Sequence, residues 1–175
     1  SYELGYHDLY INNLKTNGCS TAQRNDWYAL ILMKKKVKLP IQLIHLGEEG
    51  THIFCKARVN GLKARVLIDT GASKTVLSKS FADRLNGLKE VEVYDNATSG
   101  IGPESVVANF VRLKKLKFKS LKITKLIVGT IDVSHVDAMY SAMNVEPFDM
   151  ILGGEVLEKY HAVIDYKKRK LVLTC

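Results

Sequence analysis

The sequence predicts one mostly β domain with short helices, and three observations support this fold class. Apolar and polar residues alternate over short stretches, as in residues 53–59, which is the period of a half-buried strand. Asn60-Gly61 follows that stretch and is a strong signal for a tight β-hairpin. The chain contains no run of about 18 apolar residues, so we expect no membrane-spanning segment.

Composition indicates an ordinary globular protein rather than a metal-binding or disulfide-rich one. The chain has 175 residues, of which 46% are apolar and 25% charged. Cys19, Cys55 and Cys175 are scattered, and the five histidines show no metal-ligand spacing. We therefore expect no metal, no cofactor and a reducing, cytoplasmic location, or a periplasmic one if a signal peptide has been removed.

The formal net charge of +8 raises the question of an anionic partner. A basic surface can attract nucleic acid or acidic peptides. No aromatic-rich platform accompanies the charge, so we interpret the lysines as solvated faces and edge-strand protection, and we do not expect nucleic acid to be a partner. Most of the positive charge lies in Lys34-Lys35-Lys36, in residues 112–125 and in Lys167-Lys168-Arg169-Lys170.

Residues 1–33 differ in composition from the rest and are predicted to be an N-terminal arm or extension of a domain at 34–175. A short helix could begin after Thr21, but no clear period runs through this stretch. Met33-Lys34-Lys35-Lys36 also reads like a translation start. An upstream extension, a structural arm and an added segment all remain open.

The first strands of the predicted domain lead to a carboxylate. Residues 37–46 are extended, and Pro40 confines them to a sheet edge or a strand start. The hairpin through Asn60-Gly61 places Leu62, Ala64, Val66 and Ile68 on one face of its return strand. That strand ends at Asp69, so the hairpin aims the Asp69 carboxylate.

Short helices and further strands follow. Ser78 is predicted to begin one helix, closed by Gly87, and Ser134 to cap another. The glycine-rich stretch 97–105 is either a surface turn or a mobile hairpin. Further strands are predicted at 111–114, 116–118, 121–123 and 126–128, a helix at 155–160, and a terminal hairpin at 162–166 and 171–174.

The segment around Asp69 is the strongest candidate for a functional site. The apolar run Val66-Leu67-Ile68 reads as a buried strand that ends in an acid, a hydroxyl and a glycine. Thr70 can donate and accept hydrogen bonds, and Gly71 permits a sharp turn. The alternative is that Asp69 only caps a turn, since Asp-Thr-Gly is ordinary turn chemistry.

The residues from Leu67 to Ser73, followed by Val76-Leu77-Ser78, resemble the active-site loop of retropepsin-like aspartic proteases. Ile151-Leu152-Gly153 is similar to the second hallmark of that family, a segment that crosses beside the catalytic loop. The resemblance extends over residues 50–174. It implies a retropepsin-like acid protease β-barrel that is homodimeric, and the helix expected at Ser134 is similar to one in bacterial members.

The resemblance also implies roles for individual residues. Asp69 would be the catalytic acid of a hydrolase, an aspartic-type endopeptidase acting on peptide or protein substrates. Thr70 would hydrogen-bond across the dimer, Gly71 would hold the tight loop, and Ala72 is the residue usual at its position. The flap that closes over the substrate would contain Thr98, Ser99, Gly100, Ile101 and Gly102.

The implied chemistry needs two carboxyl groups that share one proton. The chain has one Asp-Thr-Gly and no second Asp-Thr-Gly or Asp-Ser-Gly, so the resemblance implies that the second Asp69 comes from an identical subunit. Asp149 and Asp165 are the first places to look for a second acid within the chain. Two alternatives stay open: a catalytically inactive peptide-binding or dimerisation module, and a basic nucleic-acid-binding domain.

Overall fold

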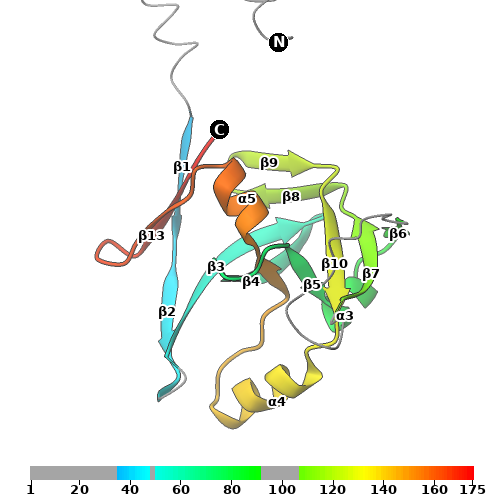
Figure 1. Ribbon diagram of the computed structural model, residues 1–175, viewed down its shortest axis with the longest axis horizontal. Helices are drawn as coiled ribbons and strands as arrows, with labels where there is room; N and C mark the ends of the chain where they lie inside the picture. The colour runs from blue at the N-terminus through cyan, green and yellow to red at the C-terminus, as the bar shows by residue number, and fades with distance from the viewer. Residues whose placement is uncertain (1–34, 48–49, 92–106) are drawn as a thin grey trace, which may run out of the picture. The chain divides into compact units, whose positions relative to one another are not determined.

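Two β-sheets form the framework of the residues that this computed structural model describes, which are 35–47, 50–91 and 107–175 (Figure 1). The predicted arm at 1–33 and the glycine-rich stretch at 97–105 lie outside these ranges, and their predicted roles stay predictions. Residues 36–175 form one compact unit. The smaller sheet has the antiparallel order β1-β13-β12, with β1 at Lys36–Pro40, β12 at Val163–Asp165 and β13 at Lys170–Thr174.

The larger sheet has the order β6-β7-β10-β5-β11-β4-β3-β8-β9, with β2 paired to β3 off this path. Its register places three strands of the site side by side, since β11 lies between β4 and β5. The strands are β2 (Gln42–His45), β3 (Thr51–Val59), β4 (Leu62–Ile68), β5 (Val76–Ser78), β6 (Lys89–Glu90), β7 (Val107–Arg112), β8 (Lys115–Phe118), β9 (Leu121–Thr124), β10 (Ile127–Ile131) and β11 (Met150–Leu152).

The hairpin of β3 and β4 confirms the prediction made from Asn60-Gly61. Asn60 has φ 49° and Gly61 has φ 100°, the left-handed conformations that a two-residue hairpin turn of type I′ requires. Along β4, Ala64, Val66 and Ile68 are buried as predicted. Leu62 was predicted on the same face but is 44% exposed, because it lies next to the turn, beyond the reach of the core.

The strand that contains Pro40 confirms the expectation of an edge position. Among the described strands, β1 pairs only with β13, and it ends at Pro40, so the ring occupies the last residue of an edge strand. Within β1, Val37 and Leu39 are buried while their neighbours are exposed. The predicted terminal hairpin is present as β12 and β13.

Three short helices complete the described fold: α3 (Lys79–Asp83), α4 (Ser134–Ala142) and α5 (Gly154–Lys159). Ser78 caps α3, because its Oγ accepts a 3.3 Å hydrogen bond from the Phe81 N–H. Gly87 does not close α3, which already ends with Arg84 as its C-cap.

The prediction that Ser134 caps the second helix is wrong. Ser134 is the first residue of α4, and its backbone N–H donates a 2.9 Å hydrogen bond to Oδ1 of Asp132. The carboxylate two residues earlier therefore takes the capping role, as Asp side chains often do in turns. The helix packs Tyr140 into an aromatic cluster with Phe54 and Phe148 on the outer face of the β3–β4 hairpin.

Candidate active site

Asp69 follows the last residue of β4 directly, at the start of a tight loop that leads to β5. Its backbone N–H donates a 3.2 Å hydrogen bond to the Leu152 carbonyl, which continues the pairing of β4 with β11. Its Oδ1 accepts a 2.8 Å hydrogen bond from the Gly71 N–H. The carboxylate is therefore both half-buried and oriented by its own loop.

Ile151-Leu152-Gly153 crosses directly beside this loop. Ile151 and Leu152 form β11 and pair with the last two residues of β4, so the segment lies against the strand that carries Asp69. Just beyond it, the Gly154 N–H donates a 2.7 Å hydrogen bond to the Ala72 carbonyl. Two segments about eighty residues apart in sequence are thus joined at the carboxylate loop by backbone hydrogen bonds.

The glycine at position 153 is required by space rather than by backbone angle. A Cβ atom there would lie 2.5 Å from the carbonyl carbon and 2.6 Å from the carbonyl oxygen of Lys74. These distances are too short for any side chain, so the backbone at Lys74 can pack against position 153 only if that residue is glycine. The Gly153 N–H in turn donates a 3.0 Å hydrogen bond to Oγ1 of Thr75.

Glu155 is a part of the site that the sequence reasoning did not identify. Its Oε1 accepts a 2.7 Å hydrogen bond from the Thr75 N–H, while its Oε2 is buried without a hydrogen-bond partner among the described residues. The carboxylate therefore holds the end of the Asp69 loop from beneath. An acid in the first turn of a helix is common for electrostatic reasons, so nothing in the sequence marked Glu155 as different.

The front of the loop faces solvent in the single chain. Thr70, Gly71 and Ser73 are exposed, and Ala72 is partly exposed. A backbone loop held tightly from behind and open in front offers a surface to a second molecule. The predicted flap residues 98–102 lie outside the described residues, so their position relative to Asp69 stays a prediction.

Asp149 and Asp165 are both engaged in contacts of their own. Asp149 accepts hydrogen bonds from Arg84 Nη2 at 2.5 Å and from the Arg65 N–H at 2.8 Å. Arg65 lies four residues before Asp69 on an extended strand. The strand rise therefore separates Arg65, the partner of Asp149, from Asp69 by roughly 13 Å. Asp165 lies in the other sheet and accepts a hydrogen bond from the Lys168 N–H.

Other groups capable of chemistry are either buried or dispersed. Burial raises the pKa of the Cys55 thiol to about 12, which leaves it protonated and unsuited to act as a nucleophile. Across residues 35–47, 50–91 and 107–175, no three His, Cys, Asp or Glu side chains gather into a set that could hold a metal ion. No helix in the same ranges is long and apolar enough to cross a membrane.

Comparison with protein families decides what this loop belongs to. The family model for aspartyl proteases matches residues 55–156, a span that contains both the Asp69 loop and Ile151-Leu152-Gly153. The chain belongs to the aspartyl protease family. The resemblance predicted from these two segments is thereby confirmed.

Curated relatives of this aspartyl protease include two larger proteins. The human protein DDI1 homolog 1 is 25% identical over 124 residues, which cover 70% of this chain and 28% of the relative. The DNA damage-inducible protein 1 of Neurospora crassa is 26% identical over 122 residues, which cover 69% of this chain and 25% of the relative. The chain thus spans about a quarter of the length of these proteins.

Solved structures with a similar chain include a retropepsin-like aspartic protease from Rickettsia conorii. It is 22% identical with a TM-score of 0.48, and the alignment covers 81% of this chain and 93% of the other. The retroviral protease-like domain of Ddi1 from Leishmania major is 13% identical with a TM-score of 0.45, covering 70% and 88%.

Proposed function

We propose that this member of the aspartyl protease family is an endopeptidase active as a homodimer. It would cleave extended segments of peptides or proteins, using a water molecule activated by two Asp69 carboxylates, one from each subunit. The observation that supports this most is the position of Asp69 at the end of β4, oriented by the Gly71 N–H and joined to β11 through Leu152. This arrangement holds a carboxylate rigidly at an exposed edge of the chain.

The chemistry follows from the behaviour of two carboxyl groups in contact. Like charges at hydrogen-bond distance cannot both be present, so the pair holds one proton between them. The ionised member takes a proton from water as it attacks the peptide carbonyl carbon. The protonated member donates a hydrogen bond to the carbonyl oxygen, which gains negative charge in the transition state.

The exposed front of the loop supports a partner subunit as the source of the second acid. The chain contains a single Asp-Thr-Gly, and Thr70 and Gly71 face solvent in the single subunit. A two-fold axis beside Asp69 would bring two identical loops together, since a C2 interface joins the same patch to itself. Thr70 would then hydrogen-bond across the interface, and Gly71 and Ala72 would keep the loop tight. Residues 98–102 would close over the substrate as a flap.

The test is Asp69→Asn, which changes the charge with almost no change in volume. We expect cleavage of a peptide library, followed by mass spectrometry, to be abolished while the circular dichroism spectrum stays the same. Asp83→Asn is the matched control, because Asp83 is an exposed residue at the end of α3. Undiminished cleavage by Asp69→Asn would overturn the proposal. Peptide binding by the wild type without any cleavage would indicate an inactive peptide-binding module instead.

A further inference from the structure

A row of positive charges crosses four neighbouring strands on the outer face of the larger sheet. The β-sheet register places Lys63 of β4 opposite Arg58 of β3, Arg58 opposite Lys117 of β8, and Lys117 opposite Lys122 of β9. A second pair, Lys56 and Arg65, lies two residues farther along β3 and β4. We call these residues the basic face: Lys56, Arg58, Lys63, Arg65, Lys117 and Lys122.

Like charges directly opposite one another in a sheet are unfavourable, and neighbouring strands are only about 4.8 Å apart. The strands cannot rotate or shift register to separate these charges, because the alternate positions Val59, Leu116 and Phe118 are fully buried in the core. None of the lysines of the basic face forms an ion pair with a described residue, and Arg58 donates only to the Gly61 carbonyl. The fold therefore holds a concentrated positive charge that the described part of the chain neutralises only at Arg65, through Glu146.

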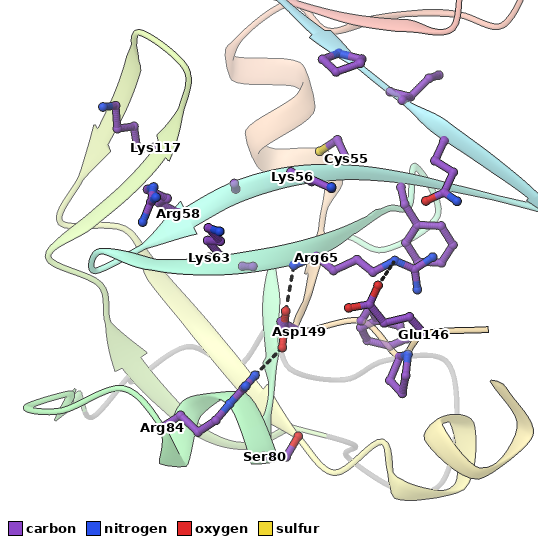
Figure 2. Close-up of a pocket in the computed structure, with 18 of the residues that line it drawn as sticks. Cys55, Lys56, Arg58, Lys63, Arg65, Ser80, Arg84, Lys117, Glu146 and Asp149 are labelled. Atoms are coloured by element: carbon purple, nitrogen blue, oxygen red, sulfur yellow. Dashed lines mark hydrogen bonds and ion pairs between the residues drawn. The ribbon is translucent and has the colours of Figure 1, made fainter. Parts of the chain in front are cut away.

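A hollow of about 1150 Å³ lies over the β3–β4 part of the basic face. Figure 2 shows Arg58 and Lys63 together near the hairpin turn, with Lys117 beyond them and Arg65 reaching toward Glu146. Pro40 and Pro147, which are exposed, contribute apolar surface to the same hollow, while Ile41 and Phe148 beneath them are buried. The hollow thus combines cations with apolar contacts.

Arg65 lines this hollow, and its guanidinium has a donor that no described residue uses. Its side chain is 10% exposed, and its guanidinium lies over the Phe54 ring with Cζ 3.8 Å from the centroid. Nε is 3.9 Å from Oε2 of Glu146, whose side chain is 82% exposed. Nη1 is buried and has no hydrogen-bond partner in the part of the chain that the structure describes. A buried cationic donor without a partner is costly, and an acceptor oxygen on a bound molecule would satisfy it.

We propose that the basic face is a docking surface for an acidic stretch of a partner polypeptide. In an extended peptide, side chains on one side recur about every 6.6–7 Å, which is also the spacing between the row and the Lys56–Arg65 pair. Alternate carboxylates can therefore meet successive cations while the remaining side chains contact Pro40 and Pro147. This docking is independent of peptide cleavage.

A polypeptide fits this surface better than a nucleic acid does. Single-stranded nucleic acids bind by stacking their bases on aromatic rings, and the two aromatic residues that line the hollow, Phe54 and Phe148, are buried. Asp137, Glu146 and Asp149 also line the hollow and would repel a continuous phosphate backbone. A peptide can avoid that repulsion by placing a neutral or basic residue beside them.

The experiment measures fluorescence anisotropy with a labelled peptide of alternating glutamate and alanine, six of each. The full chain is used with Asp69→Asn as host, so that the peptide stays intact. We expect binding at about 50 mM salt that weakens at about 300 mM salt, as electrostatic binding does. Replacing Lys63, Lys117 and Lys122 together by glutamine should weaken binding about tenfold or more. The matched control replaces Lys89, Lys159 and Lys167, which are also exposed, by glutamine. This control variant should change peptide binding less than about twofold.

The Asp69→Asn host has a formal net charge of +9, because the substitution removes one acid from a chain of net charge +8. Both triple variants lower this charge by three, to +6, so equal losses of binding would show a general charge effect and overturn the proposal. Arg65→Met retains an unbranched stem over Phe54 and removes the guanidinium, so it should weaken peptide binding with an unchanged circular dichroism spectrum. Tighter binding of a charge-matched oligothymidylate than of the peptide would also overturn it, in favour of a nucleic-acid surface. If the Asp69→Asn protein binds no peptide at all, the proposal is overturned as well.

Discussion

The backbone N–H of Thr75 donates a 2.7 Å hydrogen bond to Oε1 of Glu155, eighty residues away in the sequence. Thr75 is fully buried, and its other polar groups are used as well. Its Oγ1 accepts from the Gly153 N–H at 3.0 Å, and its carbonyl accepts from the Gly129 N–H at 3.2 Å. The end of the Asp69 loop is therefore tied by three hydrogen bonds to two distant segments, β10 and the residues that follow β11, which restricts the positions the Asp69 carboxylate can take.

Glu155 is predicted to position the loop rather than to touch substrate. Glu155→Ala should lower kcat by about 10- to 100-fold with a smaller change in KM, because a small displacement of a reacting group is costly. It should also cost about 1–3 kcal/mol of stability, since a buried N–H loses its acceptor. Glu155→Gln keeps an acceptor oxygen and should retain most of the activity. Hydrogen exchange at the Thr75 amide should be fast in Glu155→Ala; slow exchange together with an unchanged kcat would contradict this role.

Gly153 and Gly154 form a matched pair for testing the contact between the two hallmark segments. Gly153→Ala should destabilise the protein by about 1–3 kcal/mol or more, because its Cβ would lie 2.5 Å from the Lys74 carbonyl carbon. Gly154→Ala should leave stability unchanged or slightly higher, since its Cβ would meet only the Ala72 carbonyl oxygen at 3.4 Å and alanine favours the helix. Urea unfolding of both variants measures the difference, and equal midpoints would show that Gly153 is not packed as described.

Activity is predicted to belong to the dimer alone. Below the dimer dissociation constant, the cleavage rate should rise with about the square of protein concentration, and above it linearly. Mixing wild type with about nine parts of Asp69→Asn should lower the wild-type activity about tenfold, because random pairing leaves few subunits with a wild-type partner. Asp83→Asn in the same excess should not inhibit. A monomer whose rate is strictly proportional to concentration would refute the shared site.

Protease activity should also depend on pH as a bell-shaped curve. The proposed reaction needs one ionised and one protonated carboxyl group, so the active form is lost both when the pair gains a proton and when it loses one. The two sides of the curve report the apparent pKa values of the pair and not of either residue alone. Measuring kcat/KM across the acidic and neutral range tests this, and a single sigmoidal limb would contradict the mechanism.

Cys55 should make stability decrease in alkaline solution. Its pKa is raised from 9.0 to about 12 by burial, so the folded state keeps a proton that the unfolded state loses above pH 9. The contribution is complete below the unfolded pKa and is lost as pH rises toward the folded value. Between pH 8 and pH 10 the free energy of unfolding should fall by about 1 kcal/mol more in wild type than in Cys55→Ala. Parallel pH dependences of the two proteins in urea unfolding under reducing conditions would contradict the assignment.

Local chemistry determined the parts of the fold that the sequence alone predicts. Asn60-Gly61 can adopt the positive φ angles of a tight hairpin, and the alternation after it sets which side of β4 is buried, so the position of Asp69 at the strand end follows from neighbouring residues. Ser78 likewise caps a helix within three residues of itself. The Ser134 prediction failed within the same short range, because the Asp132 carboxylate accepts from the Ser134 N–H and Ser134 becomes the first residue of the helix.

Only the tertiary structure decided how distant segments meet. Glu155 becomes a support for the Asp69 loop, and Lys117 comes to lie opposite Arg58, only after β11 inserts between β4 and β5 and β8 pairs with β3. These contacts join residues about sixty to eighty positions apart, and their register depends on how the whole sheet packs its core. No local pattern of charge or hydropathy contains that register, because cross-strand partners are chosen by long-range burial rather than by sequence neighbours.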